Sequence, residues 1–348
     1  MAEAIHLDKL RSLRQANGAD VATKVIPPST HYLRFERPPV AEPVGPVVLQ
    51  SGERLEGSVK YYDYGAVGIE LILPFDKDWP ELVREASRLF EAPELENRAT
   101  ELLRTSLKRI APALIKPSES WLREDYFVIH LQEIKAADGG IMPASELLAS
   151  HSREIAQLIR GEAVSLSKEE EQEILRTNIS YSQTDLLVVA WGGALIYGSG
   201  DGVEITMQLL EYANTQLLEL RYYDSLMTNL LNDVYRSLER KAGPFSAWRL
   251  SRETAHVNTI RLDVMELTEK MDNAVKFLSD SYYARLYGVI ASKVGVPDYR
   301  RLVDQKLRTA GELYRSLVDQ FNQSRSFVLE LTVVIILILE LAFLFRGK

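Results

Sequence analysis

Cysteine is absent from all 348 residues of this sequence. A chain without thiols has no disulfide bond, no cysteine-ligated zinc or iron–sulfur cluster, and no thiol catalysis. Basic residues are also in deficit: 41 lysines and arginines face 49 aspartates and glutamates, a formal net charge of −8. This balance argues against broad nucleic-acid binding, which depends on neutralising phosphates. The 46% hydrophobic content is nevertheless sufficient for a buried core.

The first 20 residues contain no apolar core segment, so the sequence predicts no secretory signal there. Long apolar runs are scarce until residues 327–345, which are dominated by Leu, Ile, Val and Phe. A helix of that length spans roughly 28 Å, about one hydrocarbon core. The sequence therefore predicts a C-terminal transmembrane helix that acts as a tail anchor. It would leave the N-terminal bulk in the cytosol, on a bacterial or organelle inner membrane. The alternative is a buried helix of an oligomeric core.

Two acidic residues, Glu330 and Glu340, interrupt this apolar run. Charged side chains at membrane depth usually face a bundle interior and find a partner there. Both fall outside the heptad seam that enters the segment, so a simple pair of helices would not cover them. We expect association into a homo-oligomer in which Glu330 and Glu340 bridge subunits, alone or paired with Arg325 or Arg346 of a neighbour.

The rest of the chain divides by texture into three regions. Six of the 14 prolines fall between Pro27 and Pro46, which predicts an extended N-terminal arm over residues 1–46. Strand-like and helix-like patterns alternate over residues 47–200, as expected of an α+β head domain. Within it, residues 63–65 (Asp-Tyr-Gly) predict a turn between strands, and Asp78 predicts the N-cap of a helix.

Residues 203–326 consist mainly of long helical patterns. In the last of them, Val303, Leu307 and Ala310 begin a heptad that runs into the apolar segment without a break. The predicted fold is therefore an α+β head, a long α-helical coiled-coil stalk over residues 203–326 and one C-terminal transmembrane helix. Ordinary core helices of a bundle would produce the same stripes.

One glycine-rich turn joins the predicted head to the stalk. Gly198, Gly200 and Gly202 precede a helix, where exposed backbone N–H groups could bind an anion. No Lys-Ser/Thr follows, as a phosphate-binding Walker loop requires, and Val203 stands where the dinucleotide fingerprint needs its third glycine. A flexible hinge is the interpretation that we favour, and we predict no cofactor.

The histidines do not form a metal-binding pattern. No two of them are three or four residues apart, the spacing of a helical metal clamp. No catalytic set of nucleophile, base and acid stands out either, so neither catalytic nor metal-ligating residues are predicted. The five histidines are His6, His31, His130, His151 and His256.

Two stretches carry a resemblance to a known family. "SFVLELTVVIILILEL" (326–341), with Leu329-Glu330 and Glu340, resembles the C-terminal signature of the required-for-meiotic-nuclear-division family, the domain of unknown function 155. "YYDYGAVGIELILPF" (61–75) is similar to that family's early strand. The resemblance implies a membrane-anchored, oligomeric, non-catalytic protein, which in organellar members supports translation at the inner membrane. It carries no catalytic residues over to this chain.

The sequence thus predicts a non-enzymatic, homo-oligomeric membrane scaffold or tether. Its partners would be other copies of itself, the lipid bilayer and an unknown protein, and self-association would place several heads on one membrane patch. One alternative is a CorA-like channel or transporter component, although the second span and Gly-Met-Asn loop of such channels are absent. The other is a membrane-tethered nucleotide-binding protein that uses the glycine turn.

Overall fold

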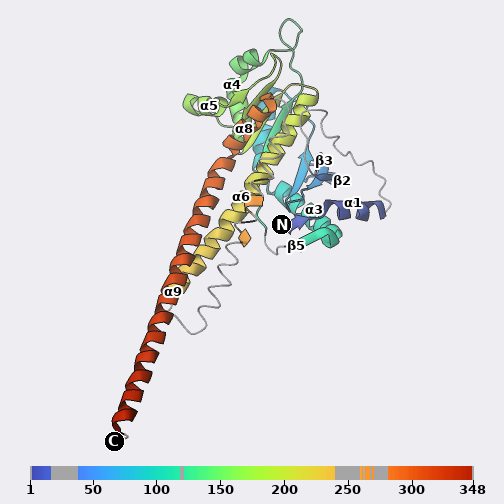
Figure 1. Cartoon of the computed structure of the whole chain (residues 1–348). Coiled ribbons are helices and arrows are strands. Elements are labelled where there is room, and N and C mark those ends of the chain that lie inside the picture. The colour runs from blue at the N-terminus through green and yellow to red at the C-terminus, as the bar shows by residue number, and fades with distance from the viewer. Residues whose placement is uncertain are drawn as a thin grey trace. The chain divides into compact units, whose positions relative to one another are not determined.

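The computed structural model describes residues 2–16, 38–117, 121–239, 259–260, 262, 264–266, 269 and 281–346. These residues belong to two compact units that alternate along the chain. Unit 1 comprises Met1–Arg221 and Glu269–Asp298, and unit 2 comprises Tyr222–Thr268 and Tyr299–Lys348. Figure 1 labels the elements of both units.

The first large sheet of unit 1 is an antiparallel meander of β2 (Val40–Val48), β3 (Arg54–Tyr61) and β4 (Val67–Ile72). The predicted turn at residues 63–65 is confirmed: Gly65 has a φ of 96°, and its N–H donates to Tyr62 O at 3.1 Å.

One face of this meander forms an apolar core in which Val59, Tyr61 and Ile69 pack against two helices. These helices are α1 (Leu7–Ala16) and α3 (Pro93–Ile110). A 3₁₀ turn, η1 (Ala111–Ala113), follows α3. The strands β1 (Ala2–Ile5) and β5 (Leu114–Pro117) form a separate antiparallel pair.

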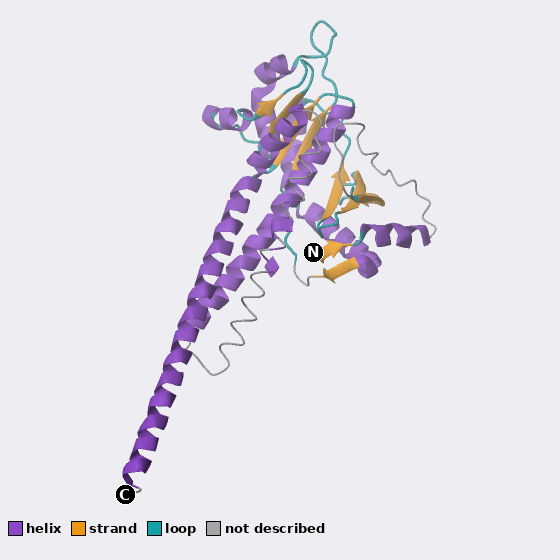
Figure 2. Ribbon diagram, in the orientation of Figure 1, coloured by secondary structure: helices purple, strands orange, loops and turns teal. Residues whose placement is uncertain are grey.

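The second large sheet of unit 1 has the strand order β6-β9-β8-β7, and Figure 2 shows it as a separate group of orange strands. Its strands are β6 (Phe127–Leu131), β7 (Asn178–Ile179), β8 (Leu186–Val189) and β9 (Gly193–Tyr197). β6 runs parallel to β9, and the other pairs are antiparallel. Every residue of β8 and β9 is buried, which explains the continuous apolar run in this part of the sequence.

Three helices, α2 (Trp79–Phe90), α4 (Ala144–Arg160) and α5 (Lys168–Leu175), share an apolar core with this sheet. The predicted cap of α2 is confirmed, because Asp78 Oδ1 accepts a hydrogen bond from Glu81 N at 2.9 Å. Local sequence therefore fixes where α2 begins.

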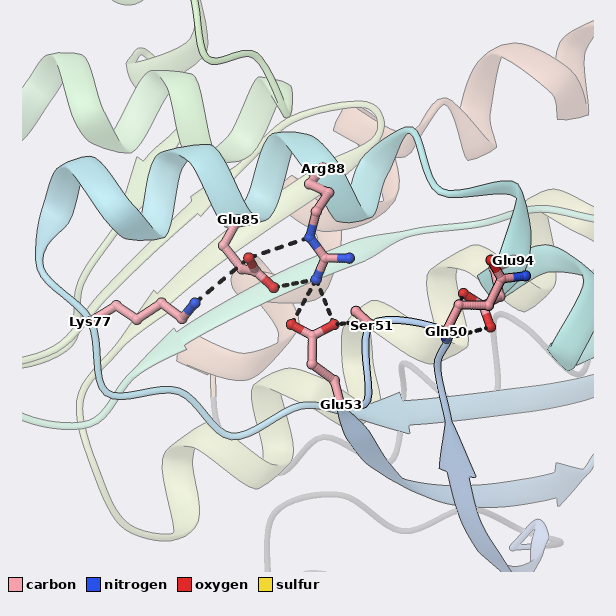
Figure 3. A network of polar contacts seen from close by, with 7 residues as sticks. All are labelled: Gln50, Ser51, Glu53, Lys77, Glu85, Arg88 and Glu94. Atoms are coloured by element: carbon pink, nitrogen blue, oxygen red, sulfur yellow. Dashed lines mark hydrogen bonds and ion pairs between the residues drawn. The ribbon is translucent and has the colours of Figure 1, made fainter.

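A polar network fixes α2 to the turn between β2 and β3 (Figure 3). Arg88 Nη2 donates to Glu53 Oε2 at 2.6 Å and also to Glu85, while Lys77 Nζ lies 3.6 Å from Glu85 Oε2. The hydrogen bond from Arg88 is the main reason why the pKa of Glu85 falls to about 2.

Long helices complete the chain: α6 (Asp201–Glu239), α8 (Ser281–Val294) and α9 (Val296–Arg346). Within unit 2, α6 and α9 share an apolar cluster with a few residues of the intervening segment. The buried members of this cluster are Met227, Leu230, Ile260, Val264, Val303, Leu307 and Ala310. Lys306 Nζ lies 2.6 Å from Asp224 Oδ1 in the same unit.

This architecture contradicts the predicted fold class. The described residues form a mixed α/β fold with three sheets, and no long coiled-coil stalk appears among them. Among the predicted seam residues of α9 whose side chains are described, Val303, Leu307 and Ala310 are buried, whereas Ile335 and Ile338 are 48% and 60% exposed. A heptad pattern alone does not distinguish this short cluster from a continuous coiled coil.

The predicted transmembrane helix and tail anchor are also wrong, and the predicted membrane localisation with them. Over the described residues, no helix has the length and apolarity required to cross a bilayer. Within the expected span, the described side chains are those of residues 333–338.

Candidate functional site

A cavity of about 1140 Å³ lies within unit 1 and is the candidate functional site. It slightly exceeds the usual range for small-molecule pockets, which is roughly 300–1,000 Å³. Its walls come from β4 with the segment that follows it, from β6 with residues 132–135, and from one face of α6.

The β4 wall meets the cavity along a strand edge. Every residue from Val67 to Lys77 lines the cavity, whereas a strand seen face-on would contribute only alternate residues. β4 is also the last strand of its sheet and pairs only with β3 in the described part of the chain. Its backbone groups on the other side therefore border the cavity.

A partly buried ion cluster occupies the cavity-side face of this sheet. Lys60 Nζ lies 2.7 Å from Glu211 Oε2 on α6 and 3.3 Å from Glu70 Oε2 on β4. Ser58 Oγ donates to Glu70 Oε2 at 3.1 Å. In the strand register, Lys60 pairs with Gly68 and Ser58 pairs with Glu70. Paired residues point to the same side of a sheet, so all four lie on the side away from the apolar core.

The two carboxylates determine the charge of Lys60. Its side chain is only 8% exposed, and burial acts to lower the pKa of the ammonium group. The charges of Glu211 and Glu70 outweigh burial, so the pKa of Lys60 lies above its ordinary value. Lys60 is therefore a fixed cation between two acids, and the cluster retains an excess of one negative charge when both acids are ionised.

Close approach of α6 to the sheet depends on Gly68. A Cβ atom at this position would lie 3.0 Å from Glu211 Oε1 and 3.6 Å from the Tyr62 ring. A glycine here thus leaves room for the Glu211 carboxylate to reach Lys60.

The β6 wall presents alternate side chains to the cavity, namely Tyr126, Val128 and His130. Ile129 faces the apolar core instead, and Leu131 belongs to that core and also borders the cavity. Tyr126 Oη donates to Ala190 O at 3.0 Å, which fixes the ring at the start of this wall.

The α6 wall is a single helix face, because its successive lining residues are separated alternately by three positions and by one. They are Met207, Leu210, Glu211, Asn214, Thr215 and Leu218. Thr215 Oγ1 and Tyr64 Oη are 2.8 Å apart, so the turn between β3 and β4 is hydrogen-bonded to this face. Burial raises the pKa of Tyr64 well above its ordinary value, which keeps the phenol neutral.

Acidic side chains outnumber basic ones around the cavity. The charged lining residues are Glu70, Asp76, Lys77, Glu124, Glu133, Lys135 and Glu211. Two cations partly compensate this excess. Lys60 pairs with Glu70 and Glu211, and Arg221 pairs with Glu124. With Lys60 and Arg221 included, the five acids still exceed the four bases by one.

Beside this wall, α6 carries a buried acid that does not line the cavity. Glu219 is 5% exposed, and its Oε1 atom has no hydrogen-bond partner within the described residues. Burial raises the pKa of Glu219 to about 8. This carboxyl is therefore largely protonated at neutral pH.

The sequence-predicted site residues lie elsewhere. Gly198 and Gly200 have φ values of 131° and 89° in the turn before α6, and Gly202 is within the first turn of that helix. None of the three lines the cavity. His130 Nε2 and Gly198 O are 2.9 Å apart, so this turn is tied to β6. Anion binding there stays a prediction.

The side chains of Arg325, Glu330, Glu340 and Arg346 lie outside the described residues, so their predicted role in assembly stays a prediction. In the described part of the chain, no three His, Asp or Glu side chains gather as metal ligands would. Sequence reasoning missed Lys60, Glu70 and Glu211. The available signal was the placement of Lys60 and Glu70 inside strands, at positions that share one face.

Comparison with known proteins identifies relatives of this chain. A family described as "Uncharacterized protein MJ0711, N-terminal domain" matches residues 1–203. The chain is also 23% identical over 187 residues to the uncharacterized protein MJ0711 of Methanocaldococcus jannaschii. That alignment covers 54% of this chain and 57% of the relative's length. No solved structure matches the chain.

These matches overturn the resemblance to the required-for-meiotic-nuclear-division family, which was wrong. The short C-terminal motif lies beyond the matched region, and its composition of Leu, Ile and Glu is common to many helices. Because the matched region covers more than half of the sequence, this chain belongs to the MJ0711 N-terminal-domain family.

Proposed function

We propose that this protein is a non-catalytic binding protein that holds a positively charged ligand in the cavity of unit 1. The observation that carries this proposal is the excess of acidic over basic side chains in a cavity of about 1140 Å³. A cavity whose walls carry an excess of one sign of charge attracts ligands of the opposite sign.

Glu70 is the residue best placed to contact such a ligand. Its side chain is 37% exposed and lines the cavity, whereas Lys60 behind it is 8% exposed. Lys60 is held by two acids, so the approach of a second cation to Glu70 leaves Lys60 paired with Glu211. The buried pair thus fixes the carboxylate geometry before the ligand arrives.

Isothermal titration of the full chain with spermine, a linear polyamine, tests this proposal. We expect saturable binding that weakens severalfold in Glu70→Gln and weakens further with added salt. Glu56→Gln is the matched control, because Glu56 is an exposed glutamate on the neighbouring strand that does not line the cavity. Absence of saturable heat at millimolar spermine, or equal weakening in both variants, would contradict the proposal.

A second proposal, self-association into a scaffold, is favoured by a different feature. Residues 333–338 of α9 (Val-Val-Ile-Ile-Leu-Ile) are apolar and between 48% and 60% exposed. Six consecutive residues cover more than one full helical turn, so every side of the helix is apolar there. Other copies of the same helix are the occupant that we propose for this surface.

The mass of the full chain by sedimentation velocity tests this second proposal. Self-association should be lost when Ile335 and Ile338 are both replaced by Lys. The matched control carries Lys in place of Leu302, which is also exposed but lies outside the run. A monomer at all concentrations would overturn the scaffold proposal and leave the ligand proposal intact.

A further inference from the structure

We infer that the ligand of the cavity is an extended, basic peptide segment of a partner protein, which pairs with the free edge of β4 as an additional strand. This inference rests on the proposed function, because it names the chemical class of the positively charged ligand. Strand addition of this kind takes affinity from main-chain hydrogen bonds and specificity from alternate side chains.

The hydrogen-bond alternation of β4 identifies the groups that would pair. Tyr62 N–H donates to Ala66 O at 3.0 Å, at the end of the β3–β4 hairpin. In an antiparallel ladder, hydrogen-bonded and non-hydrogen-bonded pairs alternate from that point. By this alternation, Val67, Ile69 and Leu71 belong to the non-hydrogen-bonded pairs of the hairpin. Their N–H and C=O groups therefore point away from β3 and toward the cavity that these residues line.

The composition of β4 also fits an edge that is used for binding. Proteins usually protect free edges with proline, lysine or a bulge, because an unprotected edge pairs with other strands. β4 (Val-Gly-Ile-Glu-Leu-Ile) contains neither proline nor lysine, and its register with β3 is regular throughout. In this fold the cavity, rather than the strand sequence, limits what can reach the edge.

Size and charge select an extended basic segment over a compact molecule. β4 is six residues long, so its edge extends for about 20 Å. A strand beside it would direct alternate side chains to the sheet face that carries Glu70 and that Glu211 of α6 contacts through Lys60. Lysine or arginine at those alternate positions complements the acidic lining.

A designed peptide with alternating residues, acetyl-Val-Lys-Val-Lys-Val-amide, tests the inference by titration into the full chain.

Two N-methylated versions of this peptide separate strand pairing from charge attraction. One is methylated on the lysine backbone nitrogens and the other on the valine backbone nitrogens. Alternate N–H groups of a paired strand point in opposite directions. We expect one version to bind at least about tenfold more weakly, because it loses two main-chain hydrogen bonds if the lysine N–H groups pair with β4 and three if the valine N–H groups do. The other version should bind within about twofold of the parent.

The outcomes separate this inference from the proposed function. Equal binding of both methylated versions and the parent would overturn strand pairing and leave a cation site. Binding of spermine without binding of the parent peptide would have the same consequence. Absence of binding for both probes would overturn the inference and the proposed function together.

Substitutions in the protein test where the basic side chains lie. Glu70→Gln should weaken binding of the parent peptide, and Glu56→Gln should not. Equal effects of the two substitutions would overturn the placement of the basic side chains beside Glu70.

Discussion

Lys60 Nζ and Glu211 Oε2 are 2.7 Å apart and join β3 to α6 across 151 positions of sequence. Lys60 is almost completely buried, so its charge depends on its carboxylate partners rather than on water. This pair holds the helix face that lines the cavity against the sheet that carries Glu70.

Replacement of Glu211 by Ala should therefore lower the free energy of unfolding by about 2 kcal/mol. The loss lies below the 3–5 kcal/mol typical of a broken buried pair, because Glu70 remains beside Lys60. Urea denaturation measures it. Glu101→Ala is the control: it breaks an exposed contact of 3.2 Å with Arg98 and should cost less than about 1 kcal/mol. Equal losses in the two variants would show that Lys60 does not depend on Glu211.

The network around Arg88 predicts a loss of stability in acid. Because the pKa of Glu85 is lowered to about 2, the folded state holds this carboxylate ionised at a pH where the unfolded chain is already protonated. Its stabilising contribution is fully present above about pH 4.5 and is lost as the pH falls from there toward 2. Glu85→Gln should remove about 1 kcal/mol at pH 7, since the Arg88 side chain is 42% exposed.

The same variant should flatten the stability curve between pH 4.5 and pH 2. Denaturation midpoints measured across this range, with Glu56→Gln as the control, give the comparison. An acid-dependent loss of unchanged size in Glu85→Gln would show that other groups are responsible.

Glu219 predicts the opposite dependence on pH. Its pKa is raised to about 8 by burial, so the folded state binds a proton that the unfolded chain releases at about pH 4.5. Stability should therefore fall as the pH rises from about 4.5 to about 8. Glu219→Gln keeps the shape of the side chain without the titration, and should be more stable than the parent at pH 8 by on the order of a few kcal/mol.

At pH 4.5 the stability difference between Glu219→Gln and the parent should nearly vanish. Thermal or urea denaturation at both pH values measures it. A constant difference at the two values would show that Glu219 is not the titrating group.

A fold prediction concerns Gly161, the C-cap of α4. Its φ is 73°, and a Cβ atom there would lie 2.3 Å from Phe90 Cγ. Phe90 is itself stacked on Phe127 of β6, with ring centroids 3.8 Å apart, so it has little freedom to move away. Gly161→Ala should cost about 3 kcal/mol, from the left-handed backbone and the clash together.

Gly52→Ala separates these two causes, because Gly52 has a φ of 89° and nothing within 4 Å of the Cβ position. It should cost only about 1 kcal/mol, the backbone part alone. If both alanine variants lost the same stability, the packing of Phe90 against Gly161 would contribute nothing.

The features that local sequence determines were predictable. Asp78 caps α2 and Gly65 forms the β3–β4 turn because their chemistry acts on neighbouring backbone groups. The cluster of Lys60, Glu70 and Glu211 was not predictable, since periodicity assigns a residue to a face but does not name the element packed on that face. The apolar composition of residues 327–345 likewise describes a tendency for burial, and it led to a span that the described residues do not contain.

Amide hydrogen exchange of the full chain, with and without saturating spermine, tests the central proposal most directly. A ligand in the cavity should slow exchange in residues 67–77 and 126–135 and in the first half of α6, which together form its walls. The two ends of α4 and the turn at residues 51–53 should remain unchanged. Binding of spermine with no slower exchange in the wall segments would place the ligand elsewhere and contradict the proposed function.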